Sequence, residues 1–373
     1  MIINIEDLNY HYIFTWEQRK LGDVIFVNSG KDYKQLNVGQ IPVYGTGGYI
    51  TSVNDKLSDE DAIGLGRKGT INKPYMLKAP FWTVDTLFFL TNKKENKLSF
   101  LFPLIQRINW LRYDESTGLP SLSKNNIEKV KVSLPKIDEQ SRIGQLVSQV
   151  NSVLVLYQRK LDLLKQLKQG MLQKLFVDNN SKQPVLRFKK FNGDWKQQKL
   201  GEIFSERKQK SANGQLLSVS IARGVYPFDE NERKDNSSND QHNYRLVKVN
   251  DIAYNSMRRW HGAEGYSKYE GIVSPAYTVL IPQEGTNSIF FSFMFKRVEM
   301  LRTFQAHSQG LTPDTWNLKY PLFKNILVSL PSDQEQKSVS DLLNKLNEVI
   351  NLYQSKIDIL TRLKKFLLQQ MFI

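Results

Sequence analysis

The feature that most constrains the fold of this chain is a long internal repeat. The segment SLPKIDEQ at residues 133–140 returns as SLPSDQEQ at 329–336, an offset of 196 residues. At the same offset, LYQ at 156–158 returns at 352–354. Solenoid repeats are much shorter, about 20–50 residues. The chain is therefore predicted to contain two copies of a domain followed by a helix, a pseudo-two-fold arrangement that suits a partner with two-fold symmetry.

Each copy ends in an apolar pattern whose steps alternate between four and three residues, which is a heptad seam. The seam is predicted to consist of Val150, Leu154, Tyr157, Leu161 and Leu164 in the first copy, and of Leu346, Ile350, Tyr353, Ile357 and Leu360 in the second. Both copies interrupt the seam with a lysine, Lys168 or Lys364. A narrow seam on a helix of about 40 residues needs a partner, so we predict an intramolecular coiled coil. The alternative is that each seam packs on its own domain.

The composition restricts the class of protein. The chain has 373 residues, a net charge of +15 and no cysteine. This length accommodates two domains, and the missing cysteines exclude disulfides and thiolate zinc sites and fit a cytoplasmic location. We find neither an apolar run long enough to span a membrane nor a secretory signal. The positive charge indicates either a solvated basic surface or a nucleic-acid partner.

The globular part of each copy begins alike and diverges inside. WEQRKLG at residues 16–22 returns as WKQQKLG at 195–201, so the second globular part is 17 residues longer. Strands are predicted at 81–84, 86–90, 276–281 and 326–330, and helices at 98–110 and 290–304. Each half is therefore expected to be α+β. The predicted domain boundaries are a divergent segment 1–15, globular domain 16–135, helix 136–177, linker and entry segment 178–194, globular domain 195–331 and helix 332–373.

Several loops carry residues suited to nucleic acid, because arginine and asparagine pair with base edges and aromatic rings stack on bases. An ordinary surface turn is the alternative for any one of these loops. The candidates in the first half are Tyr44, Thr46, Tyr49, Arg67, Lys68 and Thr70. Those in the second half are Arg223, Tyr226, Tyr254, Asn255, Arg258, Arg259 and Trp260. Turns at 116–120 and 310–313 accompany them.

The sequence lacks the motifs of the enzymes that act on nucleic acid. Residues 64–70 superficially resemble a phosphate-binding loop but do not end in Gly-Lys-Ser/Thr. The chain has no Pro-Pro pair and therefore no Asn/Asp-Pro-Pro-aromatic motif. The four histidines have no metal-ligand spacing. We therefore predict a non-catalytic chain without a metal site.

With these residues in hand, the chain resembles the specificity subunit of a Type I restriction-modification enzyme over almost its whole length. The similarity is carried by the repeated openings and helix starts, by the helix ends LQKLF at 172–176 and LQQMF at 368–372, and by the entry segment 184–195. The corresponding entry segment is not matched before Trp16. The resemblance implies two target recognition domains joined by antiparallel helices.

The resemblance also implies a function and partners. Each domain would read one half of a bipartite, asymmetric site in double-stranded DNA, and the helices would bind two methyltransferase subunits, with two restriction/translocase subunits joining them. S-adenosylmethionine, ATP and magnesium would belong to those partners. One alternative is a non-catalytic coiled-coil adaptor that binds DNA non-specifically, and a further alternative is a stand-alone nuclease.

Overall fold

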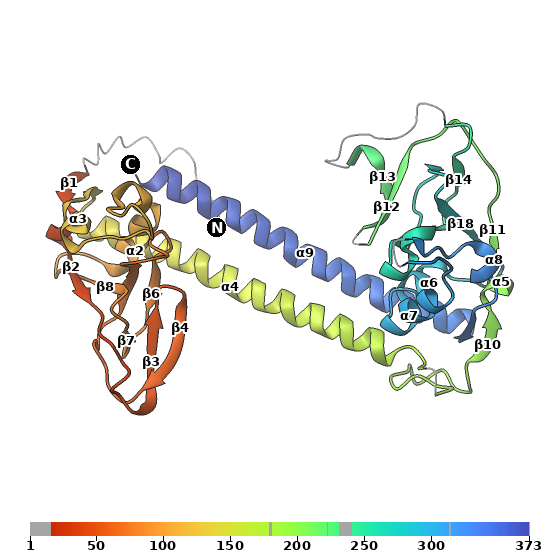
Figure 1. Ribbon diagram of the computed structural model, residues 1–373, viewed down its shortest axis with the longest axis horizontal. Coiled ribbons are helices and arrows are strands. Elements are labelled where there is room, and N and C mark those ends of the chain that lie inside the picture. Colours follow the sequence, from red (N-terminus) through yellow and green to blue (C-terminus); the bar gives the residue numbers. More distant parts are fainter. Residues whose placement is uncertain (1–15, 179–180, 222, 231–240, 313–314, 373) are drawn as a thin grey trace, which may run out of the picture. The chain divides into compact units, whose positions relative to one another are not determined.

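The computed structural model describes residues 16–178, 181–221, 223–230, 241–312 and 315–372, apart from the side chain of Arg258 (Figure 1). The divergent segment 1–15 lies outside this description. The chain divides into two compact units, the first containing residues up to 159 and from 355 onward, the second residues 160–354. Each unit therefore combines one globular half with the beginning of one long helix and the end of the other.

Unit 1 is built on an antiparallel four-stranded sheet with the order β2-β8-β5-β6. These strands are β2 (Ile25–Ser29), β8 (Leu87–Asn92), β5 (Ala62–Gly66) and β6 (Tyr75–Leu77). A second sheet contains β4 (Gly48–Val53), β3 (Val38–Gly45) and β7 (Trp82–Thr83). The remaining elements are β1 (Glu17–Lys20), α1 (Leu21–Val24), α2 (Leu98–Arg107), η2 (Trp110–Tyr113), α3 (Lys124–Lys129) and β9 (Lys131–Leu134).

Unit 2 repeats the four-stranded sheet with the order β11-β18-β15-β16. These strands are β11 (Phe204–Glu206), β18 (Tyr277–Pro282), β15 (Ile252–Asn255) and β16 (Glu264–Tyr266). Two ribbons join it, β12 (Leu217–Ser220) with β13 (Gly224–Pro227) and β14 (Arg245–Val247) with β17 (Gly271–Val273). The remaining elements are β10 (Lys196–Lys199), α5 (Leu200–Ile203), η3 (Phe228–Glu230), η4 (Ser256–His261), α6 (Ser288–Met294), α7 (Val298–Ala306), α8 (Tyr320–Phe323) and β19 (Leu327–Leu330). The expected α+β class is confirmed.

The repeated sequences at the two ends of each half pair with one another. Strand β1 lies antiparallel to β9 with Glu17 opposite Leu134, and β10 lies antiparallel to β19 with Lys196 opposite Leu330. The glutamine at the start of each long helix also makes the same bond, because Gln140 donates to the Pro135 carbonyl (3.0 Å) and Gln336 to the Pro331 carbonyl (3.2 Å). The repeat therefore encodes a frame, from which the divergent loops emerge.

The two predicted long helices are present as α4 (Ile137–Lys174) and α9 (Asp333–Met371). Every predicted seam residue is buried or half-buried, whereas residues on the opposite faces are exposed. In unit 1, Val147 of α4 shares a core with Leu368 and Met371 of α9, and in unit 2, Leu172 of α4 shares a core with Val339 of α9. The beginning of each helix thus packs with the end of the other, which confirms the antiparallel coiled coil.

A phenylalanine at the end of each long helix enters the core of a globular half. Phe372 is 2% exposed and stacks on Phe100 with 5.2 Å between ring centroids. Phe176, at the equivalent repeat position, is 1% exposed and lies 5.0 Å from Phe290. An arginine covers each ring, with Arg107 5.4 Å from the Phe372 centroid. The helix ends are therefore structural parts of the two domains.

Two predicted helices are shorter than expected. The apolar run 290–304 was predicted as one helix but forms α6 and α7, separated at Phe295–Arg297. The break lets the buried Arg297 guanidinium donate to the Val177 carbonyl (3.0 Å) and to Asp178 (2.9 Å), so satisfying a charge overrides helix continuity. The predicted helix 98–110 ends at Arg107, and a separate 3-10 turn begins at Trp110.

Candidate nucleic-acid interface

The loops predicted to bind nucleic acid in the two halves leave the same position of the repeated sheet. The residue after β5 is Arg67, whose N–H donates to the Thr86 carbonyl (2.8 Å). The residue after β15 is Ser256, whose N–H donates to the Ala276 carbonyl (3.2 Å). These are equivalent connections, from β5 to β6 and from β15 to β16, although their sequences share nothing.

A second loop crosses each of these connections. The Leu122 N–H donates to the Arg67 carbonyl (2.9 Å), and the Leu318 N–H donates to the Ser256 carbonyl (2.9 Å). These residues follow the turns at 116–120 and 310–313 that the sequence singled out, although 313 and 314 lie outside the described residues. Each half therefore brings two separate loops to one end of its sheet. We call these loop pairs the first and second reading surfaces, residues 67–73 with 114–124 and residues 256–262 with 308–312 and 315–319.

The first reading surface is basic and shaped by two glycines. Arg67, Lys68 and Thr70 are exposed. A side chain at Gly66 would meet the Thr70 carbonyl at 2.1 Å, and Gly69 has a φ of +83°, a backbone conformation that favours glycine. A cavity of about 280 Å³ opens beside the loop and is lined by Ser29, Arg67, Lys68, Phe88, Ser121, Leu122, Ser123 and Lys124.

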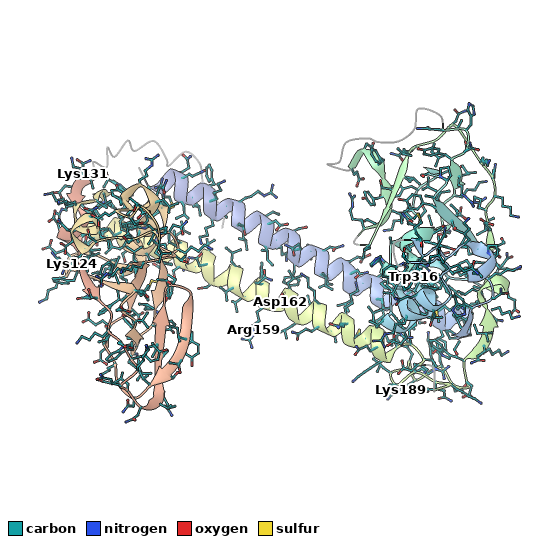
Figure 2. All side chains as sticks on the ribbon, viewed as in Figure 1. Lys124, Lys131, Arg159, Asp162, Lys189 and Trp316 are labelled. Carbon is teal, nitrogen blue, oxygen red and sulfur yellow. The ribbon has the colours of Figure 1, made fainter. Side chains whose placement is uncertain are left out.

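The cation of Arg67 is held from two sides. Its guanidinium lies 5.6 Å from the Phe88 ring centroid and donates weakly to the Asp85 carbonyl (3.5 Å). Lys124 was not predicted, since nothing in its local sequence places it near Arg67. Its side chain, labelled in Figure 2, is 57% exposed, lines the same cavity and forms a surface ion pair with Glu128 at 3.8 Å. The first reading surface therefore presents three lysine and arginine side chains, one of them in a weak surface ion pair, and exposed cations of this kind can bind phosphates.

The second loop of this surface is stiffened by one carboxylate. Asp114 Oδ1 accepts hydrogen bonds from the N–H groups of Ser116 (3.0 Å) and Ser121 (2.9 Å). These backbone donors, that of Ser121 foremost, lower the pKa of Asp114. A second link, from the Gly69 N–H to the Pro120 carbonyl (2.8 Å), holds this loop against the first.

The tyrosine candidates lie on the hairpin of β3 and β4. Tyr49 is 63% exposed and Tyr44 is half-buried, with 6.3 Å between the ring centroids. Thr46, between them, is half-buried. The hydroxyl of Tyr75 donates to the Gly45 carbonyl (2.6 Å), and burial raises the pKa of that hydroxyl. The hairpin is thereby fastened to β6, and of the two tyrosines Tyr49 offers the open ring for stacking.

The second reading surface differs from the prediction at two residues. Tyr254 and Arg259 were candidates for contact with nucleic acid, but both are completely buried. Tyr254 shares the core of unit 2 with Ile252, and both faces of β15 are covered because Ala253 between them is buried as well. Arg259 forms an ion pair with the equally buried Glu264. Neither side chain is available at the surface, and sequence pattern alone does not distinguish an exposed arginine from a buried one.

The remaining candidates of this surface surround the η4 turn. Asn255 caps η4 by accepting from the Met257 N–H (3.0 Å), and Met257 is 47% exposed. Trp260 is half-buried, with its ring 5.6 Å from that of Trp316, which Figure 2 labels. The side chain of Arg258 lies outside the described residues.

A cavity of about 380 Å³ lies against η4 and contains residues that sequence reasoning missed. It is lined by Glu206, Arg245, Ser256, Met257, Pro275, Ala276, Thr278, Asn317, Lys319, Tyr320 and Pro321. Arg245 pairs with Glu206 at 2.7 Å, so Lys319 supplies the exposed cation here. These residues come from distant parts of the sequence, and only the fold brings them together.

The last two candidates belong to the β12–β13 hairpin. The Arg223 guanidinium lies 3.9 Å from the Tyr226 ring centroid and forms an ion pair with Glu230. Tyr226 is 9% exposed. The charge of the exposed Arg223 side chain is therefore balanced by Glu230, and the Tyr226 ring mainly packs against the guanidinium.

Within the part of the chain that the structure describes, no group of three or more histidine, cysteine, aspartate or glutamate side chains is arranged to hold a metal ion. None of the helices formed by the same residues combines the length and the apolarity needed to cross a membrane.

Comparison with known proteins points to one family. The family described as Type I restriction modification DNA specificity domain matches residues 14–166 and again 192–362. The Type I restriction enzyme MjaVIII specificity subunit of Methanocaldococcus jannaschii is 27% identical over 160 residues, which are 41% of this chain and 33% of the relative. The aligned region thus spans only about a third of that relative's length.

The fold is shared over nearly the entire chain with one solved structure. The S subunit of a Type I restriction-modification system from M. genitalium matches with a TM-score of 0.68 at 15% identity, covering 98% of both chains. The HsdS subunit from Thermoanaerobacter tengcongensis covers 96% of both chains at 14% identity, with a TM-score of 0.45.

Proposed function

The chain belongs to the Type I restriction modification DNA specificity family, with two copies of its domain, and we propose that it reads the two halves of a bipartite, asymmetric site in double-stranded DNA. One observation carries the proposal. The frame is repeated closely, whereas the two reading surfaces that it supports have unrelated residues at equivalent positions. A repeated frame with different surfaces suits two different half-sites.

The charge of the surfaces supports this proposal. Arg67, Lys68 and Lys124 gather at the first surface, and Lys319 lies at the second, in a chain with a net charge of +15. Cations at a surface bind phosphates and position a protein on DNA, while loops beside them reach base edges. On this proposal the exposed or half-buried side chains of Tyr49, Met257 and Trp260 would contact bases.

We further propose that this chain supplies recognition and that chemistry belongs to partner subunits. On this reading two methyltransferase subunits and two restriction/translocase subunits bind S-adenosylmethionine, ATP and magnesium, and the complex acts on DNA in the cytoplasm. The support within this chain is a repeated apolar stripe on the outer faces of the long helices. The stripe consists of Leu156, Leu163 and Leu167 on α4 and of Leu352, Ile359 and Leu363 on α9.

These stripes are suited to a protein partner. Leu156 is 63% exposed and Leu352, at the same repeat position, 52% exposed. Spacings of seven and four residues place the members of each stripe on one helix face. The polar side chains of Arg159 and Asp162 project from α4 near the stripe (Figure 2). Two equal stripes suit two copies of the same partner.

The test is to express the chain with its methyltransferase partner and to sequence the methylated positions of the host DNA. We expect a split motif with two unlike halves.

Replacing Arg67 and Lys68 by alanine should weaken or alter recognition of one half alone, and Met257→Glu should do so for the other half, because an added carboxylate repels phosphate. Binding measured against salt should show a shallower slope for the Arg67/Lys68 variant. The proposal is contradicted if neither variant changes recognition of a half-site, or if either variant abolishes recognition of both half-sites. If the chain binds DNA without sequence preference and the variants leave that binding unchanged, the coiled-coil adaptor is favoured instead.

A further inference from the structure

The second reading surface has a buried ion pair beneath it, between Arg259 of η4 and Glu264 of β16. We propose that this pair is a positioning device that holds η4 in the one conformation that discriminates among bases. The inference rests on the proposed role of η4 in reading DNA and assigns that role a structural cause.

The surroundings of the pair are unusual for two charges. Both side chains are 0% exposed, with Arg259 Nη1 against Glu264 Oε2. The guanidinium carbon lies 4.1 Å from the Phe304 ring centroid, 4.6 Å from Phe295 and 4.7 Å from Tyr254. These rings belong to α7, to the end of α6 and to β15, so the arginine is clamped between three elements of the core.

Stability is a poor explanation for such a pair. Removing two charges from water is unfavourable, and apolar residues of similar volume often serve at least as well in a core. The pair makes a single close contact, and none of the three guanidinium nitrogens or the two carboxylate oxygens has a hydrogen-bond partner among the described residues. A buried pair that is replaceable for stability, and whose two charges can meet only when the chain turns between them, is suited to specifying a conformation.

The pair is placed to fix η4 at its exit. The entry of the loop is held by backbone bonds from Ser256 and Leu318, described above. At the exit, Gly262 has a φ of +83° and its N–H donates to the Arg259 carbonyl (2.9 Å), and the Glu264 N–H donates to the Gly262 carbonyl (2.9 Å). The chain thus turns sharply between the two charged residues, and their side chains join the two ends of that turn on its buried side. Met257, which is exposed, lies between the two fixed ends.

The first half shows that the same connection can be anchored without charge. In the loop after β5, Ile71 is 1% exposed and belongs to the core of unit 1. Its N–H donates to the Gly69 carbonyl (3.0 Å), which closes the turn. An apolar residue is thus compatible with this fold, and the charged pair is a feature of the second surface in particular.

The test uses the complex with the methyltransferase partner and the double variant Arg259→Met/Glu264→Leu. This variant leaves no unpaired buried charge, so the chain should fold with a thermal midpoint near that of the unchanged protein. We expect discrimination at the half-site read by unit 2 to fall about tenfold or more at one or more base pairs. Discrimination at the half-site read by unit 1 should remain unchanged. General destabilisation would lower discrimination at both half-sites, so it would not produce this difference. Hydrogen exchange should also become faster at residues 256–261 and not in the strands of the sheet.

A second variant guards against a misfolded double variant. Arg259→Lys keeps the positive charge but loses the planar guanidinium, and it should relax the same half-site. If a folded variant of either kind keeps the original preference at both half-sites, the positioning role is wrong. Met257→Glu separates this failure from a failure of the proposed function. If Met257→Glu alters recognition of the half-site and the pair variants do not, only the positioning inference fails. If Met257→Glu has no effect on recognition, η4 takes no part in reading DNA.

Discussion

Replacing Phe372 by alanine tests whether the end of α9 is a structural part of the first domain. The ring is 2% exposed, stacks on Phe100 at 5.2 Å and meets Trp16 edge-on at 6.0 Å. A buried phenylalanine removes about 150–250 Å² from water. At about 25 cal/mol/Å², and allowing for the β-carbon that alanine keeps, the loss is roughly 3–5 kcal/mol. The bond from Arg107 to the Phe372 carbonyl (2.6 Å) involves the backbone and should remain, so the variant isolates the ring.

The matched control is Phe366→Ala in the same helix. Phe366 is 55% exposed, and its replacement should change stability by no more than about 0.5 kcal/mol. Urea unfolding followed by circular dichroism measures both variants, and hydrogen exchange locates the loss. We expect Phe372→Ala to lower the protection of α2 and of the β1–β9 pair, while unit 2 keeps its protection. Equal behaviour of the two variants would refute the reasoning, because the helix end would then contribute no more than a surface residue.

The remaining predictions concern charges within the two units. Lys168→Met and Lys364→Met should raise the melting temperature, since burial lowers the pKa of both seam lysines and the penalty falls on their charged form. That advantage should shrink as the pH rises through the lowered pKa of the folded lysines toward the unfolded value of about 10.4, because the buried lysines of the unchanged protein lose their charge in that range. A constant difference across a pH series of thermal melts would argue against desolvation as the cause. Arg187→Ala should destabilise unit 2 by about 3–5 kcal/mol, because it leaves the carboxylate of Glu335, 3% exposed, without its cation. The comparison is Lys56→Ala, which breaks a surface pair and should cost at most about 1 kcal/mol; similar urea midpoints for these two variants would contradict this assignment.

The sequence alone determined the parts of this protein that depend on neighbours along the chain. Heptad spacing defines which face of a helix is apolar, so both long helices and their seams were predictable down to Leu161 and Ile357. The repeated openings and helix starts likewise indicated a duplicated frame and a resemblance to a known family. The strands β8 and β18 followed from runs of β-branched and aromatic residues. These patterns are local, and burial of one face is enough to account for them.

The tertiary structure sets which residues meet at the reading surfaces. Lys124 joins Arg67, and Lys319 approaches η4, through contacts between segments far apart in the sequence. It also decided that Arg259 is buried, because an arginine in a loop is exposed or enclosed according to what packs around it, and here three aromatic rings and Glu264 enclose it. Similarly, the apolar run 290–304 breaks where Arg297 finds its partners across the unit. The pairing of charges and the packing of side chains depend on residues far apart in the chain, so the local sequence does not predict them.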